Sequence, residues 1–150
     1  MTANELVECT KLADRRGFES AWMAEGHGGD AFAILSACAL STKKIRLGTS
    51  ISSVFVRSAP TIALGAATVD SLSRGRFILG LGTSHQAQVE REHGLLFEKP
   101  IARLQETMEI VRGLLQNSKI SYRGKIFPQI DFDYWFTPLR KRIPIYVSAV

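Results

Sequence analysis

The chain of 150 residues is 45% hydrophobic and 22% charged, a composition that excludes a disordered or fibrous protein. Its net charge of +5 would suit a phosphorylated cofactor or an acidic metabolite, whereas nucleic acid is not expected because the basic residues stand in short groups, Lys43-Lys44 and Arg140-Lys141-Arg142, without interleaved aromatic residues. No apolar run approaches the roughly 18 residues that span a bilayer, and no signal segment opens the chain, so we expect a cytoplasmic protein without membrane contact.

The first two elements expected along the chain are a helix and a short strand. Thr2 and Glu5 fit a capping box, and the apolar pattern that follows continues until Gly17. Residues 20–24 then form an apolar run, which predicts a buried strand.

A glycine-rich loop at residues 25–30 follows this strand, and Asp30 is placed to cap a second helix over residues 31–40. Cys9 and Cys38 fall within the two helical patterns at spacings unsuited to zinc. We therefore expect both to be small buried residues in a reducing compartment.

Two later apolar runs predict strands that end in the same way. Residues 45–51 contain Gly48-Thr49-Ser50, and residues 77–81 run into Gly82-Thr83-Ser84. Between them, Pro60 opens a helix with an unusually small face, and a turn with glycine at its left-handed position follows. The small face consists of Ala63, Gly65, Ala66 and Ala67, and the turn of Ser73, Arg74 and Gly75.

The remaining elements are less regular. A polar segment spans residues 85–92, residues 120–127 resemble a small hairpin around Arg123-Gly124, and residues 129–142 are expected to be irregular. Another apolar strand begins at residue 143 and continues to residue 147.

The longest helix is expected to begin at Pro100. Arg103 and Glu106 stand three residues apart on its outer side and could form an ion pair. Its apolar stripe consists of Ile101, Leu104, Met108, Val111 and Leu115.

Alternating helices and buried strands predict an α/β protein with a parallel sheet, and the spacing suits the repeating units of a (β/α)8 TIM barrel. A parallel strand needs neighbours on both sides, yet the sequence ends within one. We therefore interpret residues 1–150 as a partial domain. Ligands of such sheets bind at the carboxyl ends of the strands, which makes residues 82–85 a candidate site.

Motifs distributed along nearly the whole chain resemble the luciferase-like superfamily of flavin- and deazaflavin-dependent oxidoreductases. Two of them, Thr49-Ser50-Ile51 and the segment 99–103, are most similar to the branch that uses coenzyme F420, which includes methylenetetrahydromethanopterin reductases and F420-dependent dehydrogenases. The others are Phe18 to Trp22 with Glu25, Thr42, the segment 45–48, Arg57 with Pro60, Leu72 to Arg76, Leu79 to Gly82, His93-Gly94 and Glu106.

The resemblance implies a partial (β/α)8 barrel of about strands 2 to 5, without the first strand and the C-terminal half. It also implies a site for the ring of F420 or FMN. In deazaflavin members a non-prolyl cis peptide backs the ring at the position of Ser50-Ile51. Thr83 and Ser84 would contact the ring edge or the substrate, although a polar loop that caps the next segment would carry the same residues. The implied cofactor-binding residues are Gly48, Thr49, Ser50, Ile51, Gly82, Thr83, Ser84 and His85.

Glu25 and His27 are the implied catalytic residues. The family usually places an acidic residue directly before a catalytic histidine, and here Gly26 separates the two. His27 could reach the site as a general acid or base, or face solvent on its loop. His85 is a second candidate for that role.

Other motifs give weaker signals. Glu90 and His93 form a Glu-x-x-His, but a di-iron site needs two such motifs, so we expect a structural role and no metal. The segment Gly80-Leu81-Gly82 does not fit a dinucleotide fingerprint because His85 stands where the third glycine belongs.

The sequence therefore predicts an oxidoreductase that uses F420 or FMN for hydride transfer or monooxygenation of a small organic substrate, in a homo-oligomer. The alternative is a non-catalytic barrel fragment that needs a partner half or self-association to fold.

Overall fold

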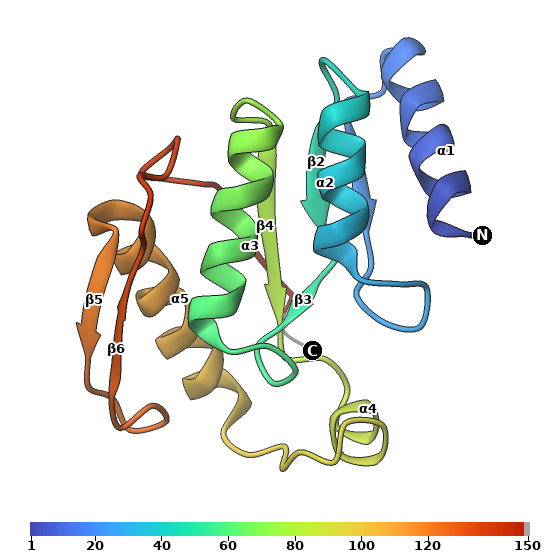
Figure 1. The fold of residues 1–150 in the computed structure, drawn as a ribbon. Coiled ribbons are helices and arrows are strands. Elements are labelled where there is room, and N and C mark those ends of the chain that lie inside the picture. Colours follow the sequence, from blue (N-terminus) through green and yellow to red (C-terminus); the bar gives the residue numbers. More distant parts are fainter. Residues whose placement is uncertain (149–150) are drawn as a thin grey trace.

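The structure, a computed structural model, describes residues 1–148 and has helices packed on a parallel sheet (Figure 1). The helices are α1 (Ala3–Arg15), α2 (Ala31–Ser41), α3 (Ala59–Leu72), α4 (Gln86–Arg91) and α5 (Pro100–Asn117). The strands are β1 (Ser20–Met23), β2 (Arg46–Thr49), β3 (Ser52–Ser53), β4 (Phe77–Gly82), β5 (Lys119–Tyr122), β6 (Ile130–Asp133) and β7 (Ile145–Ser148).

Strand β4 is the centre of the five-stranded sheet. One edge of β4 pairs first with β2 and then with β3, and its other edge pairs with β7, always in parallel. Residues 46–53 thus run along one side of β4 and are interrupted at the Ser50-Ile51 peptide, which is cis, as the resemblance implied. Strand β1 pairs with β2 and forms the far edge.

The two faces of the sheet differ. Alternate residues of β4, Phe77, Leu79 and Leu81, are fully buried, and the Phe77 ring centroid lies 6.2 Å from that of Phe32 in α2. This face is covered by helices in the order α1, α2, α3 and α5. On the opposite face, Trp22 and Tyr146 stack with ring centroids 5.6 Å apart and remain 37% and 54% exposed.

Three helices begin where their capping residues or proline predicted. Thr2 and Glu5 form the capping box of α1, Asp30 caps α2, and Pro60 lies in the first turn of α3. The three alanines of the small face of α3 are buried, and a Cβ atom at Gly65 would lie 2.7 Å from the Phe32 ring. The small residues therefore let both the sheet and α2 approach α3 closely.

The structure corrects the prediction for residues 85–142 in three places. The polar segment contains the short helix α4, and the hairpin is longer than expected, with β5 pairing β6 across a loop. Glu106 accepts hydrogen bonds from the backbone N–H groups of Lys125, Ile126 and Phe127, so this loop is fixed on α5. The second hairpin strand therefore lies in the segment expected to be irregular.

Four side chains also differ from expectation. The Arg103 guanidinium lies over the rings of Phe55 and Phe127, at 4.8 and 5.2 Å from their centroids, while Glu106 binds the loop. Ile101 is 61% exposed because the buried stripe of α5 begins one turn later at Leu104. Cys9 is exposed, whereas Cys38 is buried as predicted.

Candidate functional site

The carboxyl ends of β1, β3, β4 and β7 meet at one edge of the sheet and surround two adjoining cavities. The smaller has a volume of about 170 Å³ and the larger about 530 Å³. Glu25, Ser84 and Gln88 line both. The other residues of the smaller cavity are Ser50, Ile51, Thr83, His85 and Ser148.

Two glycines of β4 let residues 49–51 lie directly against that strand. A Cβ atom at Gly80 would lie 2.0 Å from the carbonyl oxygen of Thr49, and one at Gly82 would lie 2.8 Å from Cγ1 of Ile51. Any larger residue would displace this segment. The close approach sets the Ile51 side chain beside β4 at the edge of the smaller cavity.

Thr49 is completely buried, and its hydroxyl completes the bonding of the sheet at this point. The Oγ1 atom donates to the carbonyl of Gly80 at 2.8 Å and accepts from the N–H of Gly80 at 2.9 Å. The side chain therefore replaces a pair of backbone hydrogen bonds where the strand is interrupted.

The structure brings together most of the residues that the sequence singled out. Five of the eight implied cofactor-binding residues line the smaller cavity with Glu25: Ser50, Ile51, Thr83, Ser84 and His85. Gly48, Thr49 and Gly82 are buried in the sheet below it and do not line either cavity among the described residues. A Cβ atom at Gly48 would lie 2.4 Å from the Trp22 ring, so this glycine serves packing.

Glu25 lies at the floor between the two cavities and uses both carboxylate oxygens. Oε1 accepts from Nε of Arg57 at 2.5 Å, and Oε2 accepts from the hydroxyl of Ser52 at 2.9 Å. Arg57 also pairs with Asp30. Burial acts to raise the pKa of Asp30, but the backbone N–H of Ala33 and the Arg57 guanidinium outweigh it and lower that pKa.

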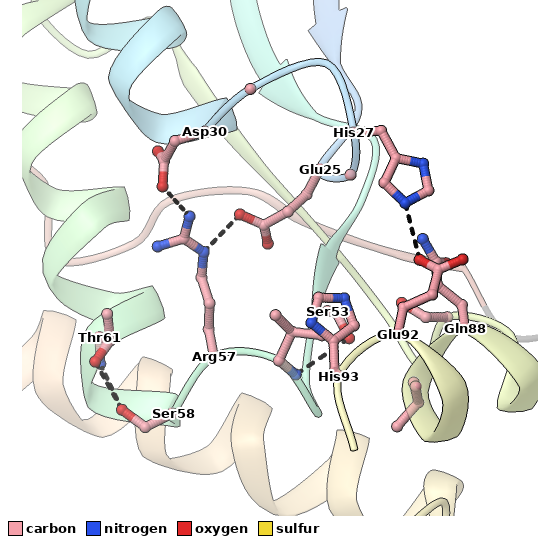
Figure 2. Close-up of a pocket in the computed structure, with 15 residues that line it drawn as sticks. Glu25, His27, Asp30, Ser53, Arg57, Ser58, Thr61, Gln88, Glu92 and His93 are labelled. Atoms are coloured by element: carbon pink, nitrogen blue, oxygen red, sulfur yellow. Dashed lines mark hydrogen bonds and ion pairs between the residues drawn. The ribbon is translucent and has the colours of Figure 1, made fainter. Parts of the chain in front are cut away.

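His27 stands at the rim of the larger cavity, with its side chain 82% exposed. Its Nε2 atom lies 3.0 Å from Oε2 of Glu92, just after α4, so the contact bridges two walls of the cavity (Figure 2). His27 and Glu25 thus line the same cavity but occupy its rim and its floor.

Several lining residues carry polar chemistry that sequence reasoning did not assign to the site. Arg57 had been singled out only for its family resemblance, and its partner Glu25 is 32 positions away, so no local spacing reveals the pair. The others are Asp30, Ser53, Ser58, Thr61, Gln88, Glu92 and His93.

The Glu-x-x-His motif on and after α4 does not form a cluster of ligands. Glu90 instead accepts a hydrogen bond from the side-chain amide of Gln86 at 3.0 Å. Within residues 1–148, no group of three or more histidine, cysteine, aspartate or glutamate side chains could hold a metal ion. No helix in the same part of the chain is long and apolar enough to cross a membrane.

Comparison with known proteins identifies the family. All of residues 1–150 match the family described as luciferase-like monooxygenase. The chain belongs to this family. It is 32% identical over 146 residues to a 5,10-methylenetetrahydromethanopterin reductase of Archaeoglobus fulgidus, covering 97% of this chain and 43% of that protein. It is 35% identical over 159 residues to an F420-dependent glucose-6-phosphate dehydrogenase of Segniliparus rotundus, covering 97% of this chain and 47% of that protein.

Solved structures agree in fold. The coenzyme F420 dependent tetrahydromethanopterin reductase from Methanopyrus kandleri superposes with a TM-score of 0.87 at 26% identity, covering 98% of this chain and 47% of that one. The monooxygenase RslO1 from Streptomyces bottropensis gives a TM-score of 0.86 at 24% identity, covering 97% and 46%. The chain thus spans less than half the length of the relatives it matches, and its fold is the predicted partial TIM barrel.

Proposed function

We propose that this luciferase-like chain supplies the ring-binding part of an oxidoreductase that uses coenzyme F420 or FMN on a small organic substrate. The observation that carries the proposal is the smaller cavity, in which Ser50 and Ile51 meet Thr83, Ser84 and His85 at the carboxyl ends of the strands. Ligands of parallel α/β folds bind at these ends.

The residues of this cavity suit a heteroaromatic ring. Ile51 offers an apolar surface, while the hydroxyls of Ser50, Thr83 and Ser84 and the imidazole of His85 offer hydrogen bonds. The ring supplies the redox chemistry when it is bound, and the protein binds and orients it. The Segniliparus relative is F420-dependent and so is the Methanopyrus reductase, which favours F420 over FMN.

Glu25 and His27 have different roles in this proposal. Both oxygens of Glu25 already accept hydrogen bonds, so Glu25 orients its neighbours. His27 is exposed at the cavity rim, and in this proposal its imidazole exchanges a proton with a substrate in the larger cavity.

Fluorescence titration with F420 and, separately, with FMN tests the proposal. We expect saturable binding of one cofactor, weakened by Thr83→Val, which removes a hydroxyl of the cavity and keeps the side chain's shape. Thr137→Val, at an exposed position after β6, is the matched control and should bind as the wild type does. A chain that is folded by circular dichroism yet binds neither cofactor would contradict the proposal and favour the non-catalytic fragment.

We also propose that the chain associates with a second copy of itself through the outer surface of α2 and α3. A surface helix ordinarily carries charged residues on its solvent side. Asp70 is the one charged residue in these two helices and is only 1% exposed, whereas the apolar Leu40 is 72% exposed. An uncharged surface of this kind can meet its own copy across a two-fold axis without burying unpaired charge.

A further inference from the structure

Arg57 lies between β3 and α3 and holds two carboxylates that belong to the loop after β1. Its Nε donates to Glu25 at 2.5 Å and its Nη2 pairs with Asp30. The guanidinium carbon lies 5.1 Å from the centroid of the Phe32 ring. Figure 2 shows the Arg57 side chain standing between the two acids.

The ion pair between Arg57 and Glu25 is largely shielded from solvent. The side chains of Arg57 and Glu25 are 21% and 12% exposed. A carboxylate that is largely removed from water needs a positive partner and hydrogen-bond donors to stay ionised in place. Without Arg57, the Glu25 carboxylate would lack its cation and would turn toward solvent.

Glu25 connects Arg57 to the segment 50–53, which borders the smaller cavity. Its second oxygen accepts from the hydroxyl of Ser52, a fully buried residue that pairs with Leu81 of β4. Ser52 directly follows Ile51, which lines the smaller cavity with Ser50. Arg57, Glu25 and Ser52 therefore form one line of contacts that ends at the cavity wall.

We propose that Arg57 is a positioning residue for the ring site, acting through Glu25 on the backbone of residues 50–53. The inference rests on the proposed function, because it takes the smaller cavity as the place where the ring binds. Asp30 fixes the other end of the guanidinium, and as the cap of α2 it cannot shift without that helix.

The planar guanidinium is required because two carboxylates are held in different directions. A lysine ammonium is a single point charge and can replace only one of the two contacts. Arg57→Lys should therefore keep part of the effect, and Arg57→Gln should lose it.

Two measurements on the same variants test the role. The first is the dissociation constant of F420 or FMN, and the second is amide hydrogen exchange at residues 52–54, where the Val54 N–H donates to the Gly82 carbonyl at 3.0 Å. We expect Arg57→Gln to weaken binding about 10- to 100-fold, a loss typical of removing a residue that orients a binding group, and to speed exchange locally. Arg57→Lys should fall between it and the wild type.

Arg46→Gln is the control. Arg46 is also paired with a glutamate, Glu19 at 3.4 Å, but it is 56% exposed and begins β2 at the opposite end of the strands. This variant should leave both binding and exchange unchanged.

The outcomes separate this inference from the proposed function. Unchanged cofactor affinity in folded Arg57→Gln, or exchange that rises equally throughout the chain, would overturn the positioning role. Binding of neither cofactor by the wild type would refute the ring site, and exchange would then decide alone. In that case a local rise at residues 52–54 supports positioning by Arg57, and no rise overturns it.

Discussion

The side chain of Thr49 forms hydrogen bonds that hold this buried residue in the sheet. Its hydroxyl both donates to and accepts from Gly80 at the point where residues 46–53 stop pairing regularly with β4. A serine or threonine is suited to this position because a hydroxyl can donate and accept at once. The signature Gly48-Thr49-Ser50 therefore combines packing, sheet bonding and cavity lining in three successive residues.

Thr49→Val should destabilise the fold strongly although its shape is preserved. The substitution leaves the N–H and the carbonyl of Gly80 buried without this partner, which costs roughly 1–3 kcal/mol for each unsatisfied group. We expect a loss of about 3 kcal/mol in the free energy of unfolding, measured with urea. Thr137→Val, at an exposed site after β6, should change it by less than about 0.5 kcal/mol; equal effects of the two variants would refute this account.

Glu106 makes the stability of the folded protein depend on pH. Burial acts to raise the pKa of Glu106, but the N–H groups of Phe127, Ile126 and Lys125 outweigh it and hold the pKa below its usual value. A carboxylate with a lowered folded pKa stabilises the protein fully above its unfolded pKa, and that contribution disappears as the pH falls through the folded pKa.

At pH 7, Glu106→Gln should be less stable than the wild type by about 2 kcal/mol, because hydrogen bonds to a charged acceptor are lost. The difference should shrink steadily below about pH 4.5, the unfolded value, since the wild type then loses the same charge. Urea unfolding at pH 7, 5, 4 and 3 measures it. Glu8→Gln, in an exposed pair with Lys11, is the control, and a pH-independent difference for Glu106→Gln would contradict the assignment.

At the scale of elements, the segment between β6 and β7 is held by an ion pair whose carboxylate is buried. The Nε atom of Arg140 lies 3.0 Å from both carboxylate oxygens of Asp70, near the end of α3, and its Nη2 donates to the carbonyl of Phe77 at 2.7 Å. Asp70 is 1% exposed. This contact fixes the route by which the chain returns to pair β7 with β4.

Replacing Arg140 should therefore lower the free energy of unfolding more than replacing its neighbour Lys141. Arg140→Gln leaves the Asp70 carboxylate buried without a cation, and we expect a loss of about 3 kcal/mol in unfolding free energy. Lys141→Gln, at an exposed adjacent position, should cost less than about 0.5 kcal/mol. Thermal and urea unfolding check both values, and similar losses in the two variants would contradict the role of the pair.

The whole molecule presents two uncommon surfaces. One is the uncharged outer side of α2 and α3, and the other is the sheet face that carries the exposed rings of Trp22 and Tyr146. Exposed apolar surfaces of this kind promote association.

The variant Leu40→Glu tests which of the two surfaces forms the contact between copies. If the helices form the contact, placing a charge at this 72% exposed residue should shift the chain to monomer, measured by light scattering at micromolar concentration. Trp22→Glu, on the open sheet face, should leave the same assembly intact. Loss of association only in Trp22→Glu would move the interface to the sheet, and a monomeric wild type would refute self-association.

The sequence by itself determined the kind and order of the main elements. Caps, turn glycines and apolar periods act between residues a few positions apart, so the capping box of α1, the Asp30 cap and the buried β4 could be predicted locally. The candidate site was predictable in outline because parallel strands end at one edge, which gathers Ser50, Ile51 and residues 83–85. Their role in binding a cofactor, and the partial-domain boundaries, stay predictions.

Only the tertiary structure decided which distant side chains meet. Arg57 reaches Glu25, Glu106 binds a loop about twenty positions away, and Arg140 reaches Asp70. These pairs depend on how the helices and strands are packed, so no local pattern records them, and a charge on a helix can equally face water, a neighbour or a backbone turn. The expected Arg103–Glu106 pair was wrong for this reason, and for the same reason the sequence did not assign Arg57 to the site.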